Sequence, residues 1–453
     1  MMRGPANSPA AFVPAMLNVR SWVPEIPEQY IQTLASRFAS QTPDQNEQDL
    51  LAFVEENRLI HERDCFNLNP ATNAISPKAE ALLASGVGSR PSLGYPGDKY
   101  EMGLEGVEKI EVLAAELVAE VFDAKYAEVR VASGQLANLY AYMVAAKPGD
   151  TVFVPSPTVG GHFSHHAQGA AGMYGLKPYL MAFNPHKYTV DLDVLRRDAL
   201  DLKPKVITVG NSLNLFPHPI KEVRAIADEV GAIVLFDAAH LCGLIAGRAW
   251  QQPLQEGAHL MTMSTYKSLA GPAGGLIVTN DAEIAQRLDA IAYPGMTANF
   301  DAAKSASIAM TMLDWQVHGR AYAAEMVSLA KDFAEALLAQ GLPVFARDRG
   351  MTTSHQFAIE AHEFGGGQAM AKLLRRANIL ACGIGLPLPE IAGDVNGLRM
   401  GTPELVRWGV GSRHVHKLAR FIADVLRGRK TPEAVTPEVT EFRRGFSKLH
   451  YLR

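Results

Sequence analysis

The spacing of apolar side chains divides the chain into an N-terminal helical part, a long alternation of strands and helices, and a mixed C-terminal part. In residues 29–38, 47–59 and 106–124, apolar side chains recur every three or four positions, which is typical of amphipathic helices. Residues 67–99 are rich in Asn, Pro, Gly and Ser, so we expect them to be mostly loop.

Short apolar runs alternate with helical segments through the middle of the chain. The predicted helices are 133–146, 192–199 and 219–230, and the predicted strands are 128–132, 151–154, 178–181, 206–209, 232–236, 260–263 and 275–278. Uninterrupted apolar strands are typical of a parallel sheet that is covered on both faces. This part is therefore predicted to be an α/β sheet with crossover helices.

Beyond residue 303 the pattern changes to that of a smaller α+β domain. It predicts helices at 303–341, 368–376 and 415–426, and strands at 344–346, 355–359 and 398–400. The last residues, with Glu441, Arg443 and Arg444, read as a charged amphipathic tail. The predicted organisation is an N-terminal arm with helices (1–75), a large domain (76–315) and a small C-terminal domain (316–453).

Composition narrows the class of protein. With 453 residues, 48% of them hydrophobic, and a net charge of −4, the chain can bury a large core, and no basic stripe suggests a nucleic-acid partner. No apolar run approaches the roughly 20 residues that cross a bilayer. Cys65, Cys242 and Cys382 lie far apart, which favours a reducing compartment and a cytoplasmic location.

One lysine carries the strongest chemical signal. Lys267 follows Ser264-Thr265-Tyr266, precedes a Gly/Pro-rich turn, and lies thirty residues after an apolar segment that ends at Asp237. A lysine amine condenses with an aldehyde, hydroxyl and backbone N–H groups hold a phosphate, and a carboxylate keeps a ring nitrogen protonated. Together these groups predict a site for pyridoxal 5'-phosphate. A solvated surface lysine is the ordinary alternative, but the nearly charge-free surroundings argue against it.

Two further segments could face such a cofactor. Ser133-Gly134-Gln135 opens a helix directly after a predicted strand, where free N–H groups suit a phosphate, although an ordinary serine N-cap would look the same. His162 follows a Gly-Gly pair. His165 and His166 lie close by, but no acidic or sulfur residue accompanies these histidines, so we predict no metal site.

Six motifs in order give the chain a family resemblance. They are Gly94-Tyr95-Pro96-Gly97, Ser133-Gly134-Gln135-Leu136-Ala137-Asn138, Gly160-Gly161-His162, Asp237-Ala238-Ala239-His240, the lysine segment, and Arg399-Met400-Gly401-Thr402-Pro403. From about residue 75 to 413 the sequence resembles serine hydroxymethyltransferase and the wider group of fold-type I pyridoxal-phosphate enzymes. This implies a mostly parallel seven-stranded sheet with helices on both faces, plus a smaller C-terminal α+β domain.

The resemblance also implies roles for individual residues. Lys267 would form the Schiff base, His240 would lie over the cofactor near the substrate, and Arg399 would hold the substrate α-carboxylate. Gly295 would donate to the phosphate of a neighbouring subunit, which implies a homodimer with shared sites, or a tetramer of two such dimers. The other implied cofactor-binding residues are Ser133, Gly134, Gln135, His162, Ser212, Asp237, Ser264, Thr265 and Tyr266.

Departures from the family pattern fall where folate would bind. Pro91 and Leu93 stand where the family has a tyrosine and a glutamate, and Glu101, next to Tyr100, stands in place of a second tyrosine. Tetrahydrofolate use is therefore doubtful. The resemblance implies aldol-type cleavage or formation of β-hydroxy-α-amino acids of the serine, α-methylserine or threonine type, through a lysine Schiff base and a quinonoid, by a folate-independent aldolase or transaldolase.

Alternatives remain open at this point. A tetrahydrofolate-dependent serine or α-methylserine hydroxymethyltransferase is the first, and a non-catalytic pyridoxal-phosphate-binding fold is the second. His240, Tyr100 and Glu101 are unranked candidates for the proton relay.

Overall fold

The computed structural model describes residues 16–90 and 92–453, and its contacts divide the chain into two units that meet between Arg63 and Asp64. The N-terminal unit contains α1 (Glu25–Ala39) and α2 (Pro43–Arg58), followed by a turn of π-helix. Helix α2 begins with a capping box, in which the Thr42 hydroxyl accepts from the Gln45 amide and the Gln45 side chain accepts from the Thr42 amide. Both predicted N-terminal helices are present, and each begins four residues earlier than expected. The predicted arm falls mostly on residues 1–15, outside the described residues.

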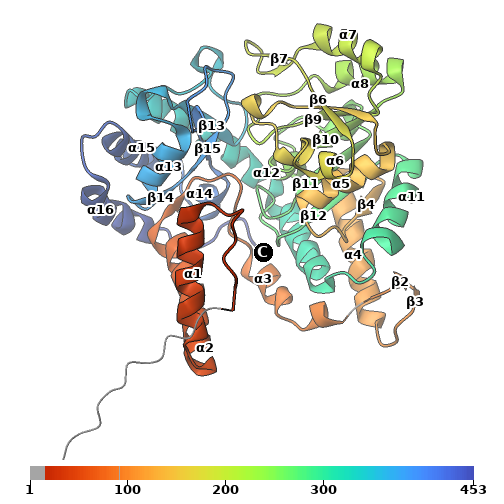
Figure 1. The fold of residues 1–453 in the computed structure, drawn as a ribbon, viewed down its shortest axis with the longest axis horizontal. Coiled ribbons are helices and arrows are strands. Elements are labelled where there is room, and N and C mark those ends of the chain that lie inside the picture. The colour runs from red at the N-terminus through yellow and green to blue at the C-terminus, as the bar shows by residue number, and fades with distance from the viewer. Residues whose placement is uncertain (1–15, 91) are drawn as a thin grey trace, which may run out of the picture. The chain divides into compact units, whose positions relative to one another are not determined.

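The second unit, from Asp64 to Arg453, is built on a seven-stranded sheet with the strand order β4-β12-β11-β10-β9-β5-β6 (Figure 1). Strands β11, β10, β9, β5 and β6 are mutually parallel, whereas β12 runs antiparallel to both β11 and β4. The strands are β4 (Tyr126–Glu128), β5 (Thr151–Val154), β6 (Lys177–Leu180), β9 (Val206–Val209), β10 (Ile233–Asp237), β11 (Leu260–Ser264) and β12 (Gly275–Thr279). The predicted α/β fold with a mostly parallel sheet is confirmed.

Helices cover both faces of this sheet. Alternate residues of β5 enter different apolar clusters. Val152 and Val154 pack on one side of the sheet, with α5 (Gly134–Ala145) and α11 (Ala282–Ala290). Phe153 packs on the other side, with α4 (Glu105–Phe122), α8 (Ile220–Val230) and α12 (Ala302–Ala339). The other helices of this part are α6 (Ala170–Met173), α7 (Leu192–Leu202), α9 (Cys242–Ala246) and α10 (Pro253–Glu256). Burial on two sides explains why these strands read as continuous apolar runs.

A second, smaller sheet follows the long helix α12 (Ala302–Ala339). Strand β16 (Gly397–Gly401) lies between β13 (Gln356–Glu360) and β15 (Cys382–Ile384), antiparallel to both. The helices around it are α13 (Gly367–Arg375), α14 (Pro403–Arg407), α15 (Ser412–Leu426) and α16 (Pro432–Arg444). The domain boundary predicted at residue 315 falls inside α12, a single continuous helix, and it stays a prediction.

The remaining elements are short. A parallel bridge joins β1 (Phe66–Asn67) to β14 (Ile379–Leu380), and two small hairpins are formed by β2 (Gly94–Tyr95) with β3 (Asp98–Lys99) and by β7 (Phe183–Asn184) with β8 (Thr189–Val190). Helix α3 (Pro77–Leu83) interrupts the region that was predicted to be loop. No helix among the described residues is long and apolar enough to cross a membrane.

Three predicted elements were wrong in detail. The first strand of the sheet is 126–128 rather than 128–132, and the residues after it lead the chain towards α5. Residues 344–346 make only one bridge, from Val344 to Ile359, because Ala346 takes a left-handed conformation with φ of 57° and ends the extended segment. The predicted charged tail is helix α16, and Arg443 in it is buried, donating from Nε to the Cys65 carbonyl at 3.0 Å.

Candidate active site

The loops after the parallel strands enclose a cavity of about 380 Å³. Open α/β sheets bind ligands at the carboxyl ends of their strands, and this cavity lies at that edge, beside the ends of β10 and β11. Ten of the predicted site residues line it: Ser133, Gly134, Gln135, His162, Ser212, Asp237, His240, Ser264, Tyr266 and Lys267. Asn138 and Asn211 also line it, although the sequence did not single them out.

Lys267 is buried at this cavity, with its Nζ 3.2 Å from His240 Nε2. Burial, opposed by the charge of Asp237 and aided by that of Arg399, lowers the pKa of Lys267 from its ordinary 10.5 to about 8. A buried amine that loses its proton this readily is a nucleophile near neutral pH. The residue therefore suits the condensation predicted from its sequence context.

Asp237 ends β10 and lies buried in the cavity wall. Its Oδ2 accepts from His165 Nε2 at 2.8 Å and from Asn138 Nδ2 at 3.0 Å, and its Oδ1 accepts from the Ala239 amide at 2.9 Å. Burial by itself would raise the pKa of Asp237, but these hydrogen bonds and the neighbouring histidines hold it well below its ordinary value. The carboxylate is thus kept ionised, as the partner of a protonated ring nitrogen must be.

The three histidines after the Gly-Gly pair do different things. His162 lines the cavity, and burial lowers its pKa to about 4. His165 bridges Asp237 and the Tyr142 hydroxyl, whereas His166 bonds the Pro155 carbonyl at 2.9 Å. His165 is a residue that sequence reasoning missed as a partner of Asp237, because 72 positions separate the two.

The start of α5 forms one wall of the cavity. The Ser133 hydroxyl caps the helix by accepting from the Leu136 amide at 3.2 Å, so the Gly134 and Gln135 amides in the first turn have no intrahelical acceptor. A Cβ at Gly134 would lie 2.0 Å from Ser264 Oγ. Glycine is therefore required for the helix end to approach the end of β11, and the resulting cradle of N–H groups fits a phosphate.

Arg399 approaches the cavity from the smaller sheet. Its Nη1 donates to the Ser212 carbonyl at 2.5 Å and lies 3.4 Å from His240 Nε2, and its Nη2 donates to Cys382 Sγ at 3.1 Å. The side chain is buried, its Nε–H has no acceptor, and none of the ion pairs found among the described residues includes it. A buried guanidinium without a carboxylate beside an open cavity is suited to an anionic ligand.

Besides Arg399, four predicted residues do not line this cavity. The Thr265 hydroxyl donates to the Pro272 carbonyl. Tyr100 is 81% exposed, and the Glu101 carboxylate accepts from the Leu93 amide at 3.0 Å, both just after the β2–β3 hairpin, which lies apart from β10 and β11 (Figure 1). Gly295 lies in the kinked segment 291–296 that follows α11.

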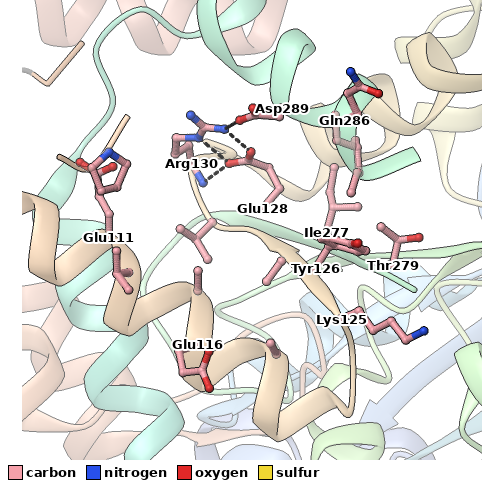
Figure 2. Close-up of a pocket in the computed structure, with 18 of the residues that line it drawn as sticks. Glu111, Glu116, Lys125, Tyr126, Glu128, Arg130, Ile277, Thr279, Gln286 and Asp289 are labelled. Atoms are coloured by element: carbon pink, nitrogen blue, oxygen red, sulfur yellow. Dashed lines mark hydrogen bonds and ion pairs between the residues drawn. The ribbon is translucent and has the colours of Figure 1, made fainter. Parts of the chain in front are cut away.

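A larger hollow of about 600 Å³ lies between α4 and α11, beside the edge strand β4. Figure 2 shows Arg130 pointing towards Glu128 and Asp289, with each carboxylate 2.6 Å from its guanidinium. Both of these carboxylates are thus paired with Arg130, and none of the predicted site residues lines this hollow. We therefore place the active site in the smaller cavity, which is lined by the Lys267 amine and the Asp237 carboxylate and approached by the Arg399 guanidinium, which has no carboxylate partner among the described residues.

Residues 44–422 match the family model for serine hydroxymethyltransferase. The chain is 83% identical to an alpha-methylserine aldolase of a Ralstonia species over 97% of its length and 100% of the relative's, and 55% identical to an alpha-methylserine aldolase of Variovorax paradoxus over the same shares. It is 37% identical to a serine hydroxymethyltransferase of Sulfolobus acidocaldarius, covering 90% of this chain and 95% of that one.

The fold has a close counterpart among solved structures. An L-threonine transaldolase from Pseudomonas fluorescens superposes with a TM-score of 0.82 at 24% identity, covering 90% of this chain and 94% of that one. The cavity holds the amine, the carboxylate and the helix N-terminus that pyridoxal phosphate requires. The chain therefore belongs to the serine hydroxymethyltransferase family and is a pyridoxal-phosphate-dependent enzyme.

Proposed function

We propose that this enzyme cleaves α-methylserine, and related β-hydroxy-α-amino acids, without folate. The observation that carries the proposal is that buried Lys267 and Asp237 line one cavity while the buried Arg399 guanidinium lies 3.4 Å from His240 in its wall, in a chain 83% identical to an alpha-methylserine aldolase. Together these side chains supply the groups for a cofactor and for an amino acid carboxylate. Leu93, where the family has its folate-handling glutamate, supports the absence of folate.

Separate residues of the chain would bind the cofactor and the substrate. Pyridoxal phosphate, when bound, supplies an electron sink for the bond that breaks at Cα. Lys267 would hold the aldehyde carbon of the cofactor, Asp237 its ring nitrogen, and the α5 amides its phosphate, with Ser264, Tyr266 and the Thr265 loop alongside. Arg399 would bind the α-carboxylate with two parallel hydrogen bonds and thereby orient the Cα–Cβ bond. In that cleavage the β-hydroxyl loses its proton and the aldehyde leaves.

The proposal includes a cytoplasmic homodimer in which the partner completes each site. Tyr100, Glu101 and Gly295 do not line the cavity of their own subunit, and Phe163 and Tyr266, beside the cavity, are 57% and 36% exposed. The Glu101 carboxylate bonds the backbone of Leu93, so it occupies the region of the missing family glutamate. This supports a role for Glu101 in moving the β-hydroxyl proton of the neighbouring site.

Subunit mixing tests the shared site. Lys267→Ala and Glu101→Gln variants, each inactive alone, should regain activity when refolded together, because a mixed dimer holds one site with both residues intact. Persistent inactivity of dimers shown to be mixed would overturn the sharing of Glu101.

Substrate cleavage tests the proposed reaction. The purified enzyme is incubated with serine, α-methylserine, threonine and phenylserine, with and without tetrahydrofolate, and the released aldehyde is measured. We expect folate-independent release, fastest from α-methylserine. Release that requires tetrahydrofolate would instead favour a hydroxymethyltransferase, the alternative that the 37% identical serine hydroxymethyltransferase supports.

A further inference from the structure

Gln356, at the start of β13, reaches from the smaller sheet to His240. Its side chain is fully buried, its Oε1 accepts from the Asn214 amide at 3.0 Å, and its Nε2 donates to the Ser212 carbonyl at 3.0 Å. The same Nε2 lies 3.2 Å from His240 Nδ1. This contact joins residues 116 positions apart, and no sequence motif indicated it.

The backbone partners fix which way the Gln356 amide points. The Asn214 N–H can only donate and the Ser212 carbonyl can only accept, so the amide oxygen must face Asn214 and the nitrogen must face Ser212. The second N–H of Nε2 is then directed at His240 Nδ1, which must accept it. When His240 is neutral, its single ring proton therefore resides on Nε2.

The surroundings of His240 keep the ring neutral. Burial, together with the charges of Lys267 and Arg399, lowers the pKa of His240 well below its ordinary value. The protonated Nε2 lies 3.2 Å from Lys267 Nζ, which accepts this hydrogen bond when the amine is neutral. Arg399 Nη1 lies farther from Nε2, at 3.4 Å. It already donates to the Ser212 carbonyl at 2.5 Å, so its hydrogen bonding does not depend on the ring nitrogen as an acceptor.

We propose that Gln356 is a positioning residue that keeps the ring proton of His240 on Nε2. His240 then offers a hydrogen-bond donor to the nitrogen held at position 267 and does not take a proton there. One consequence rests on the proposed function. Because His240 does not take a proton there, Tyr100 and Glu101 are the two remaining candidates to receive the β-hydroxyl proton.

Long-range ¹H–¹⁵N correlation spectra of the ¹⁵N-histidine-labelled, pyridoxal-phosphate-loaded enzyme test the proton's position directly, with His240 assigned from its absence in His240→Asn. We expect an Nε2–H pattern in the wild type. In Gln356→Glu, the carboxylate still accepts from Asn214 but also accepts at His240 Nδ1, so a proton should appear on Nδ1. Turnover should fall on the order of a hundred-fold, the lower end of the range of acid–base contributions.

Gln286→Glu is the matched control, since Gln286 is exposed on α11, away from the cavity, and the same charge change there should alter neither readout. An Nδ1–H pattern in the wild type would overturn the proposal, as would an unchanged His240 spectrum in folded Gln356→Glu. If that variant does not fold, Gln356→Met takes its place, because it removes the hydrogen-bond donor without adding a charge. We expect this variant to show a mixture of the two His240 tautomers. A pure Nε2–H pattern in it would contradict the inference. Wild-type aldehyde release, assayed separately, reports on the proposed function alone.

Discussion

The capture of pyridoxal phosphate by the apoenzyme should depend on pH through Lys267. Only the neutral amine attacks an aldehyde, and burial, opposed by Asp237 and aided by Arg399, lowers the pKa of Lys267 from 10.5 to about 8. At pH 7 such an amine is neutral in about one molecule in ten, which is roughly 300 times more often than an amine with the ordinary pKa. The rate of capture should therefore rise tenfold per pH unit up to about pH 8 and level off above it.

Stopped-flow absorbance in the near-violet measures this rate, with free Nα-acetyl-lysine as the reference whose rate keeps rising towards its ordinary pKa. Lys267→Ala sets the background from other amines. Replacing Arg399 by Met removes a neighbouring positive charge, so the break should move to higher pH. A wild-type rate that climbs without a break past roughly pH 9.5, as for a solvated lysine, would refute the burial argument.

Three further changes probe the site and its support. Gly134→Ala should weaken pyridoxal phosphate binding about tenfold or more, because its Cβ would lie 2.0 Å from Ser264 Oγ. Adding Ser264→Ala should restore part of that affinity, and equilibrium dialysis measures the affinity of both variants. Arg399→Lys should raise the KM for the amino acid about 10- to 100-fold with little effect on cofactor affinity, since one of two parallel hydrogen bonds is lost, and equal losses in both would contradict the assignment. Glu111→Gln should lower the free energy of unfolding, measured in urea titrations, by about 3 kcal/mol, because the buried Lys99 ammonium, 2.7 Å from Glu111, loses its carboxylate partner. A change below about 0.5 kcal/mol would show that the pair is solvated.

The sheet was predictable from the sequence because its strands are buried on both faces. Residues 206–209 and 260–263 are apolar except for one buried threonine in each, and the structure places strands over both ranges. Strand β4 was misplaced because it is short, lies at the edge of the sheet, and is followed by Val129 and Val131, which are buried and apolar without pairing as strand. Apolar character in the sequence indicates that a residue is buried, but not that it pairs in a sheet. At this edge, buried residues continue beyond the last residue that pairs with a neighbouring strand.

Local motifs located the amine, the carboxylate and the helix start, because each depends on neighbours in the chain. The support for these groups comes from contacts between distant segments. Asn138 and His165 reach Asp237 from two other elements, and Gln356 reaches His240 through the register of the smaller sheet. No spacing in the sequence encodes such contacts, since they follow from how helices and sheets pack.

Burial of charge was the other feature that sequence could not supply. Arg443 reads as part of a charged tail, yet its guanidinium lies 4.5 Å from the Trp408 ring and donates to backbone carbonyls. A long basic side chain can line apolar surface with its stem while its head finds acceptors, so its type alone does not predict exposure.

The most direct test of the account is to reduce the pyridoxal-phosphate-loaded enzyme with borohydride and map the labelled peptide by mass spectrometry. Borohydride fixes the lysine–cofactor bond irreversibly, so the adduct marks the amine that holds the cofactor. The account predicts the adduct on Lys267. Lys304 is a second buried lysine, whose pKa burial also lowers to about 8, and an adduct there or on any other lysine would contradict the assignment.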